Sequence, residues 1–268
     1  MSARPQDAAK FHDLHKDFLI LLNAWDAASA RVMQDIGAKA IATSSAAVAW
    51  AHGYADGHHL PTEKLIAVVE EIARVVSVPI TTDAEGGYSD DPRQVAENVK
   101  AFIGAGAVGV NIEDGKQPHD LHLRKIEAVR EAAVRVGVDL FINARTDVYL
   151  KRLAAPEQAL EETLRRAAAI REAGASGLFV PAIHAPQDIA TVVERAGLPL
   201  NVMAIPGVPT AKELKTLGAK RLSAATSIFN AAMAGAREAA EDFLAQGDSS
   251  ALWERRGSPP DYNKLFGG

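Results

Sequence analysis

Acidic side chains follow two short apolar stretches of this sequence. Asp83 and Glu85 come directly after the β-branched run 76–82, and Glu113 and Asp114 follow a second run of the same kind. Residues i and i+2 of a strand point to the same side, so Asp83 and Glu85 repel each other unless a cation lies between them. Oxygen ligands without Cys or a nearby His favour Mg²⁺, or alternatively Mn²⁺, over Zn²⁺.

The overall composition limits the class of protein. The 268 residues are 48% hydrophobic and 24% charged, which is enough for one large domain with a sizeable core. A net charge of -5 without a basic block argues against nucleic-acid binding. The sequence has no Cys, which is compatible with a cytoplasmic location and excludes thiolate chemistry. No apolar run reaches the length of a signal core or membrane span, so we expect no membrane partner.

Predicted strands and helices alternate at the spacing of repeated βα units. We predict strands at 18–22, 39–43, 78–82, 108–112, 140–144, 177–180, 200–204 and 220–224. We predict helices at 27–36, 62–75, 92–105, 121–136, 156–173, 186–196, 210–217 and 228–245, and a long loop at 44–61. A Gly-Ala pair precedes four of the strands, where a helix C-cap lets the chain fold back tightly. The pattern favours an α/β fold, a (β/α)8 TIM barrel over 1–247, above a doubly wound sheet. The polar tail 248–268 is expected to pack on a partner subunit or on the barrel exterior.

In a barrel of this kind the active site lies at the C-terminal ends of the strands. The polar residues at those ends belong to the first five strands, and the ends of the last three are nearly apolar. A metal ion among the three carboxylates of Asp83, Glu85 and Glu113 would act as a Lewis acid. Arg145 would bind a carboxylate, and the N–H groups of the Ser44-Ser45 dipeptide would form an oxyanion cradle. This combination suits a 2-oxo acid held as its enolate.

Five motifs resemble, in order and spacing, those of the isocitrate lyase / phosphoenolpyruvate mutase superfamily. They are Asn23-Ala24-Trp25-Asp26, Thr43-Ser44-Ser45, Asp83-Ala84-Glu85-Gly86-Gly87-Tyr88, Asn111-Ile112-Glu113-Asp114 and Ala144-Arg145-Thr146-Asp147. The resemblance spans residues 15–247 and implies a divergent, phosphonomutase-like member. It implies a Mg²⁺-dependent barrel that makes or breaks a C–C or P–C bond beside a pyruvate-like enolate. It also implies a homotetramer whose subunits exchange the last helix.

The resemblance further implies roles for individual residues. Asp83 matches the direct metal ligand, and Glu85 and Glu113 match ligands that act largely through metal-bound water. Ser44 and Ser45 match residues that hold the carboxylate and carbonyl oxygens of the substrate, and Arg145 matches an arginine that contacts it. Asp56 matches an acidic position near the metal. The catalytic candidates are therefore Asp56, Arg145, Ser44 and Ser45, and the substrate-binding candidates are Trp25, Ser44, Ser45 and Arg145.

Two departures argue against cleavage of isocitrate or methylisocitrate. The lyases carry a Cys general acid on the loop after the fourth strand, whereas this loop reads Gly-Lys-Gln-Pro-His-Asp at 115–120, so Lys116 or His119 would have to replace it. Positions near Pro181 and at 202–205 are polar in the known enzymes and apolar here, so we expect a smaller or less charged substrate. An oxaloacetate-type hydrolase or decarboxylase on the same site is one alternative. A non-catalytic barrel that binds a metabolite is another.

Ordinary structural roles compete with several of these assignments. Arg145 is equally well explained as an ion-pair partner of Asp147 or Glu113. Asp56 is also explained as a solvated loop acid, and Trp25 as packing at the barrel mouth. A zinc site at His52, His58 and His59 is not expected, because no supporting cluster accompanies them, and they are interpreted as ordinary loop histidines. Lys116, His119 and His122 are expected to be solvated loop residues.

Overall fold

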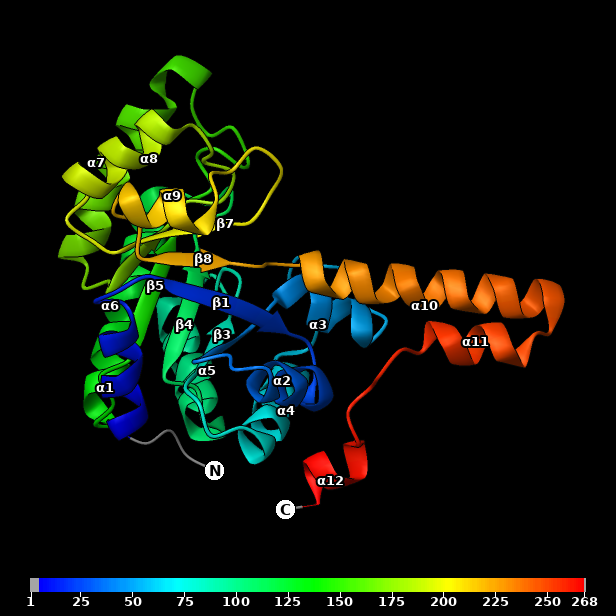
Figure 1. Ribbon diagram of the computed structural model, residues 1–268. Coiled ribbons are helices and arrows are strands. Elements are labelled where there is room, and N and C mark those ends of the chain that lie inside the picture. Colours follow the sequence, from blue (N-terminus) through cyan, green and yellow to red (C-terminus); the bar gives the residue numbers. More distant parts are fainter. Residues whose placement is uncertain (1–4, 268) are drawn as a thin grey trace. The chain divides into compact units, whose positions relative to one another are not determined.

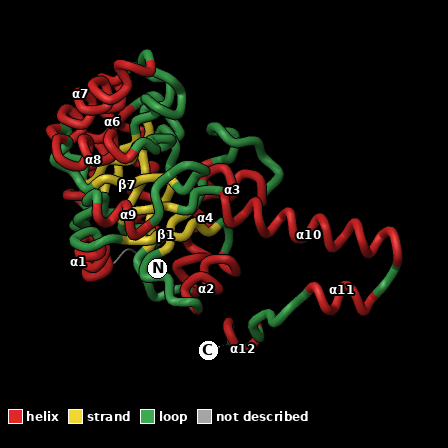
Figure 2. Tube along the Cα trace, turned by 45° about the horizontal axis from the view of Figure 1, so that its top comes forward, coloured by secondary structure: helices red, strands yellow, loops and turns green. Residues whose placement is uncertain are grey.

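The computed structural model describes residues 5–267 and confirms the predicted barrel. Eight parallel strands form a closed barrel in sequence order, and β8 pairs with β1. The strands are β1 (Leu19–Ala24), β2 (Ile41–Thr43), β3 (Ile80–Asp83), β4 (Gly109–Glu113), β5 (Phe141–Arg145), β6 (Gly177–Phe179), β7 (Leu200–Met203) and β8 (Arg221–Ser223). Within the barrel, Figures 1 and 2 show these strands at the centre with the helices that connect them on the outside. All eight predicted strands are therefore confirmed, within a few residues at their ends.

Helices alternate with the strands as predicted. They are α2 (Ala27–Asp35), α4 (Thr62–Val75), α5 (Pro92–Ala105), α6 (His119–Arg135), α7 (Ala159–Glu172) after the short η1 (Pro156–Gln158), α8 (Pro186–Arg195) and α9 (Ala211–Thr216). The Gly-Ala pairs have the expected role, because Gly106 caps α5 in the left-handed conformation with φ of 118°. After β8 come α10 (Ser227–Gln246), α11 (Ser249–Arg255) and α12 (Tyr262–Phe266).

Two helices of the barrel unit were not predicted. Helix α1 (Pro5–Leu14) precedes the barrel, and its buried Phe11 lies edge-on to Phe141 of β5, with ring centroids 5.4 Å apart. Helix α3 (Ser45–Ala51) occupies the first half of the segment predicted as a loop, so that part of the prediction is wrong. Its N-cap is Ser44, whose hydroxyl accepts a hydrogen bond from the N–H of Ala47.

The register of the strands determines which side chains face the barrel interior. Arg221 of β8 donates to Asn111 Oδ1 of β4 at 3.4 Å, a contact that joins strands on different sides of the barrel. Side chains alternate along a strand, and paired residues on neighbouring strands share a face. The inward position of Asn111 therefore identifies the other residues whose side chains face the barrel interior. Asn111 pairs with Asp83 and with Asn143. The last inward residues of β3, β4 and β5 are consequently Asp83, Glu113 and Arg145.

The chain forms two compact units, which are described separately. The first ends at Ala225 and contains the barrel, and the second begins at Thr226 and contains α10, α11 and α12. The predicted domain boundary after residue 247 and the predicted exchange of the last helix both stay predictions. Within residues 5–267, no helix combines the length and the apolar character needed to cross a membrane.

Candidate active site

Asp83 ends β3 and is fixed by the turn that follows β2. Its Oδ2 accepts hydrogen bonds from the N–H and the hydroxyl of Ser45, at 3.2 and 2.9 Å. Its own N–H donates to Thr43 Oγ1 at 2.9 Å. Within residues 5–267, no side chain forms an ion pair with Asp83, although it lies at the C-terminal end of the barrel with other acids. The hydrogen bonds from Ser45 thus orient the carboxylate of Asp83, but no cationic side chain among the described residues balances its charge.

Glu85 is a buried carboxyl group in a strained turn. Its backbone has φ of 48°, a left-handed conformation, and Gly87 that follows has φ of 90°, where a Cβ would lie 2.5 Å from Val95. The side chain accepts hydrogen bonds from the N–H of His58 and from the hydroxyl of Tyr88. Burial, and then the negative charges of Asp83 and other nearby acids, raise the pKa of Glu85 to about 7.

The loop before α4 is attached to this turn through His58. The N–H of Gly86 donates to His58 Nε2 at 2.9 Å, so this nitrogen carries no proton and the ring is neutral. Burial, and then the positive charge of Lys125, lower the pKa of His58. Asp56 in the same loop is exposed, and its charge is among those that raise the pKa of Glu85. The structure therefore places Asp56 within electrostatic reach of Glu85.

Glu113 and Arg145 belong to a dense cluster of ion pairs. Arg145 Nη1 lies 2.7 Å from Glu113 Oε2, and its Nε lies 2.6 Å from Asp147 Oδ1. Lys151 Nζ approaches Glu113 at 3.2 Å and Asp147 at 2.7 Å. Burial disfavours the cation, but the two carboxylates raise the pKa of Arg145 above its usual value. The ion-pair role weighed for Arg145 from the sequence is thus the one that this structure shows.

Asp114, which follows Glu113 in the chain, is a fully buried carboxylate with partners of its own. Asp114 accepts hydrogen bonds from Thr146 Oγ1 at 2.7 Å and from the N–H of Asp147 at 2.9 Å. Arg166 of α7 forms an ion pair with the same carboxylate at 2.7 Å. A buried carboxylate needs such partners, because an unpaired one costs several kcal/mol. Asp114 therefore joins the ends of β4 and β5 and fixes the backbone that carries Asp147.

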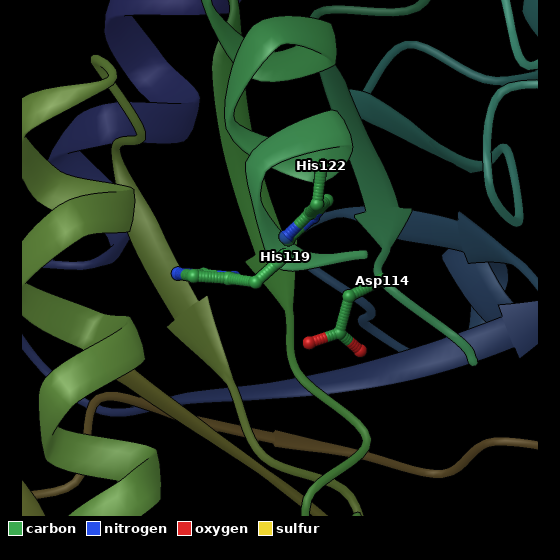
Figure 3. Close-up of side chains that lie close together, drawn as sticks. All are labelled: Asp114, His119 and His122. Carbon is green, nitrogen blue, oxygen red and sulfur yellow. The ribbon is translucent and has the colours of Figure 1, made fainter. Parts of the chain in front are cut away.

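Asp114 also belongs to a group that has the composition of a metal site. Ligand atoms of Asp114, His119 and His122 lie within 4.8 Å of one another, and Figure 3 shows the two His side chains on the first turns of α6 near the carboxylate. His122 is buried and its Nε2 contacts the Ile112 carbonyl at 3.2 Å, so the expectation of a solvated His122 is wrong. As arranged, Asp114 already accepts three hydrogen bonds, one of them from Arg166. A cation here would compete with the guanidinium of Arg166. This group is therefore a weaker candidate for a metal site than the carboxylates of Asp83, Glu85 and Glu113.

A cavity of about 280 Å³ lies beside the acidic residues. Its lining includes Glu85, Glu113, Lys116 and Lys151. His119 is absent from this lining and is grouped instead with His122 and Asp114. Of the two residues considered as a replacement for the missing Cys acid, Lys116 is the one that borders the cavity.

The structure brings together most of the residues singled out from the sequence. Asp83, Glu85, Glu113 and Arg145 meet at the C-terminal ends of β3, β4 and β5. Ser45 contacts Asp83 directly. The expected oxyanion cradle is not free, because the N–H of Ser44 donates to the Ala24 carbonyl at 3.3 Å and that of Ser45 donates to Asp83. Trp25 follows β1 and is half-buried, and its role stays a prediction.

Four charged residues of the site were not assigned roles from the sequence, and Asp147 was considered only as an ion-pair partner of Arg145. The four are Asp114, Lys125, Lys151 and Arg166. Asp147 had a local signal, because it belongs to the motif of Arg145, and Lys151 lies four residues beyond that motif. Lys125 and Arg166 are on helices and reach the site only through the packing of the barrel. Lys125 is fully buried and donates to the Gly86 carbonyl at 2.8 Å.

This arrangement has the donors of a hard-cation site. The three carboxylates Asp83, Glu85 and Glu113 offer oxygen ligands only, and the pKa values of Glu85 and Glu113 are raised, first by burial and then in part by neighbouring carboxylates. Arg145 opposes this shift for Glu113. Mg²⁺ prefers oxygen ligands and a few direct carboxylate contacts, with water completing its shell. The residues present therefore fit Mg²⁺ or Mn²⁺.

Comparison with known proteins gives a consistent set of relatives. The family model described as phosphoenolpyruvate phosphomutase matches residues 11–244. An uncharacterized protein of Mycobacterium tuberculosis is 33% identical over 86% of this chain and 87% of its own. The phosphoenolpyruvate phosphomutase of Streptomyces hygroscopicus is 29% identical over 81% of this chain and 73% of its own.

Solved structures agree with these relatives. A provisionally named phosphonomutase from Burkholderia cenocepacia J2315 superposes with a TM-score of 0.84 and 41% identity, covering 88% of this chain and 99% of that chain. The 2,3-dimethylmalate lyase, described as a member of the PEP mutase/isocitrate lyase superfamily, has a TM-score of 0.81 and 26% identity, covering 94% of each chain. Both named activities are those of the relatives.

The raised pKa of Glu85 predicts a specific dependence of stability on pH. Because the pKa of Glu85 is higher in the folded protein than in the unfolded chain, protonation of this carboxyl group stabilises the fold. This stabilisation is complete below the pKa of the unfolded chain and is lost as the pH rises through about 7. In metal-free protein, Glu85→Gln removes this loss, so the variant should lose less stability than the parent between about pH 5 and 8, by on the order of 1–3 kcal/mol. Thermal unfolding in a chelator at both pH values measures this difference. Identical pH profiles for the two proteins would contradict the assignment.

Proposed function

The chain belongs to the phosphoenolpyruvate phosphomutase family, and from this premise we propose a Mg²⁺-dependent lyase or phosphonomutase-like enzyme. It cleaves or forms a C–C or P–C bond next to a 2-oxo acid by way of an enolate. Relatives that are mutases and lyases support an activity of this class. The observation that carries the proposal is the meeting of three carboxylates, Asp83, Glu85 and Glu113, with the guanidinium of Arg145.

The residues of the site have complementary tasks in this proposal. Asp83, held by Ser45, offers the direct contact to the cation, and Glu85 and Glu113 offer oxygens at its periphery. The bound cation supplies Lewis-acid stabilisation of negative charge on the substrate oxygens. Arg145 releases one of its two carboxylate partners, Glu113 or Asp147, and binds the carboxylate of the substrate instead. A guanidinium can hold that carboxylate in a bidentate manner.

We propose Lys116 as the group that delivers a proton to the enolate carbon, which keeps the electron pair of the broken bond, so that the 2-oxo acid can leave. It follows Gly115 on the short loop after β4 and borders the cavity that Glu113 also lines. Its side chain is exposed, so it can reach the cavity without breaking a structural ion pair. His119 lacks this access, because it does not line the cavity and both of its ring nitrogens are buried.

Metal-dependent binding of oxalate tests the central proposal, because oxalate mimics the enolate of a 2-oxo acid. We expect calorimetry to show oxalate binding only with Mg²⁺ or Mn²⁺ present. Asp83→Asn should weaken it at least 100-fold, because the direct carboxylate contact is lost. Asp120→Asn removes one exposed acid on α6 and should leave the affinity unchanged. Equal affinity of the Asp83→Asn protein and the parent would refute the assigned ligand.

A pair of variants tests the proton donor. Lys116→Met should lower kcat for release of the 2-oxo acid by about 100-fold or more, the usual effect of removing a general acid. His119→Ala should change kcat less than threefold. The rate is measured as pyruvate formed from a panel of 2-oxo acid precursors with Mg²⁺. If instead His119→Ala abolishes turnover and Lys116→Met does not, the two roles are exchanged.

We also propose that the cytoplasmic protein is a homotetramer that exchanges its last helix. In the barrel unit, the exposed Ile20 and Ile36 border a groove of about 310 Å³. In the second unit, Met233 and Trp253 are exposed. Apolar surfaces of this kind usually mark interfaces. Light scattering of the intact chain should give the mass of a tetramer, and Ile20→Glu should reduce it. A monomeric parent chain would contradict the proposal.

A further inference from the structure

The last inward-facing side chains at the C-terminal ends of β3 to β8 divide into a charged group and an uncharged group. The last inward residues of β3, β4 and β5 are Asp83, Glu113 and Arg145. On β6 the corresponding residue is Phe179, which pairs in register with Arg145 and whose ring lies 5.6 Å from its guanidinium carbon. On β7 it is Met203, which pairs with Ser223 of β8. Three neighbouring strands thus end in side chains that carry no charge.

A buried cation lies on this side of the barrel, but not at its mouth. Arg221 is two residues before Ser223 on β8, which places its backbone about 6–7 Å farther from the C-terminal end. Its side chain is fully buried and donates to Asn111 at 3.4 Å. Asn201, which pairs with Arg221, is equally buried. Arg221 therefore belongs to the interior layer beneath Phe179 and Met203.

The loops that continue these strands also lack charge. Residues 181–185 read Pro-Ala-Ile-His-Ala, and residues 204–209 read Ala-Ile-Pro-Gly-Val-Pro. The one titratable residue among them is His184, which is exposed and contacts the carbonyl of Ala182 at 3.1 Å. The mouth beside β6 and β7 consequently offers apolar surface, with no guanidinium or ammonium group from these two strands or their loops.

This distribution of charge decides which substrate substituent is favourable here. A second carboxylate or a phosphonate placed against Phe179 and Met203 would lose its hydration without a free cationic partner, which is strongly unfavourable. The nearby Arg145 is already paired with Glu113 and Asp147 and is assigned to the first carboxylate of the substrate. A hydrocarbon group at the same place gains about 25 cal/mol for each Å² removed from water.

We propose that the substrate is a 2-oxo acid derivative whose distal substituent is a hydrocarbon group, not a second anion. This inference rests on the proposed function and deepens it, because it assigns the substituent that faces β6 and β7. It also favours a C–C bond over a P–C bond, since a phosphonate is an anionic substituent. The carboxylate and carbonyl of the substrate bind on the side of β3, β4 and β5, and the hydrocarbon group packs against Phe179 and Met203.

Two ligands of similar shape test this preference. Oxaloacetate and 4-methyl-2-oxopentanoate share the 2-oxo acid portion and differ in whether a carboxylate or an isopropyl group ends the chain. Calorimetry with Mg²⁺ on the intact protein should show at least tenfold tighter binding of 4-methyl-2-oxopentanoate. Met203→Lys should reverse this preference by tenfold or more, because it places an ammonium group at the apolar wall. Val134→Lys adds the same charge on an exposed position of α6 and should leave the preference unchanged.

The outcomes separate this inference from the function on which it rests. Tighter or equal binding of oxaloacetate by the parent protein, together with Mg²⁺-dependent oxalate binding, overturns the inference and leaves the proposed function standing. Loss of Mg²⁺-dependent binding of all three ligands refutes the proposed function, and the inference fails with it. Because the comparison of ligands uses the unaltered chain, it does not depend on the folding of Met203→Lys.

Discussion

The structure depends on the neutralisation of carboxylates crowded at the ends of three neighbouring strands. Five acids meet there, and the protein supplies fewer cations than acids at the same place. They are Asp83, Glu85, Glu113, Asp114 and Asp147. Arg145, Lys151 and Arg166 are paired with three of these acids, whereas Asp83 and Glu85 have only hydrogen-bond donors or a neutral His58. In the proposed function, a divalent cation is the component that would balance this charge.

The scaffold holds these charges through contacts between segments far apart in the sequence. Asp114 connects β4 to the backbone after β5, and Arg166 of α7 holds Asp114 in turn. Lys125 of α6 donates to Gly86 and to Gln117, so it links the turn after β3 with the short loop after β4. These bonds explain how two acidic motifs separated by about thirty residues can act as one site, since parallel strands end at the same edge.

The barrel and the carboxylates could be predicted from the sequence because both depend on local patterns. Apolar runs of strand length and left-handed glycines such as Gly106 mark the βα repeats, and residues after strands mark the site. Helix α3 was missed because its small apolar residues lack amphipathic periodicity, and α1 because only the folded barrel gives Phe11 a partner. The ion pairs of Lys151 and Arg166 depend on the distance between strand ends and helices, which spacing alone does not provide. For the same reason His122 was predicted to be exposed, although the packing of α6 buries it.

Anomalous scattering from crystals soaked in Mn²⁺ and oxalate tests the central claim most directly. Mn²⁺ replaces Mg²⁺ with similar oxygen ligands and can be located directly from its anomalous signal. The account predicts one strong peak within about 2.5 Å of an Asp83 oxygen, with Glu85 and Glu113 around it and oxalate completing the shell. A peak at the group of Asp114, His119 and His122 with none beside Asp83, or no peak at either place, would contradict it.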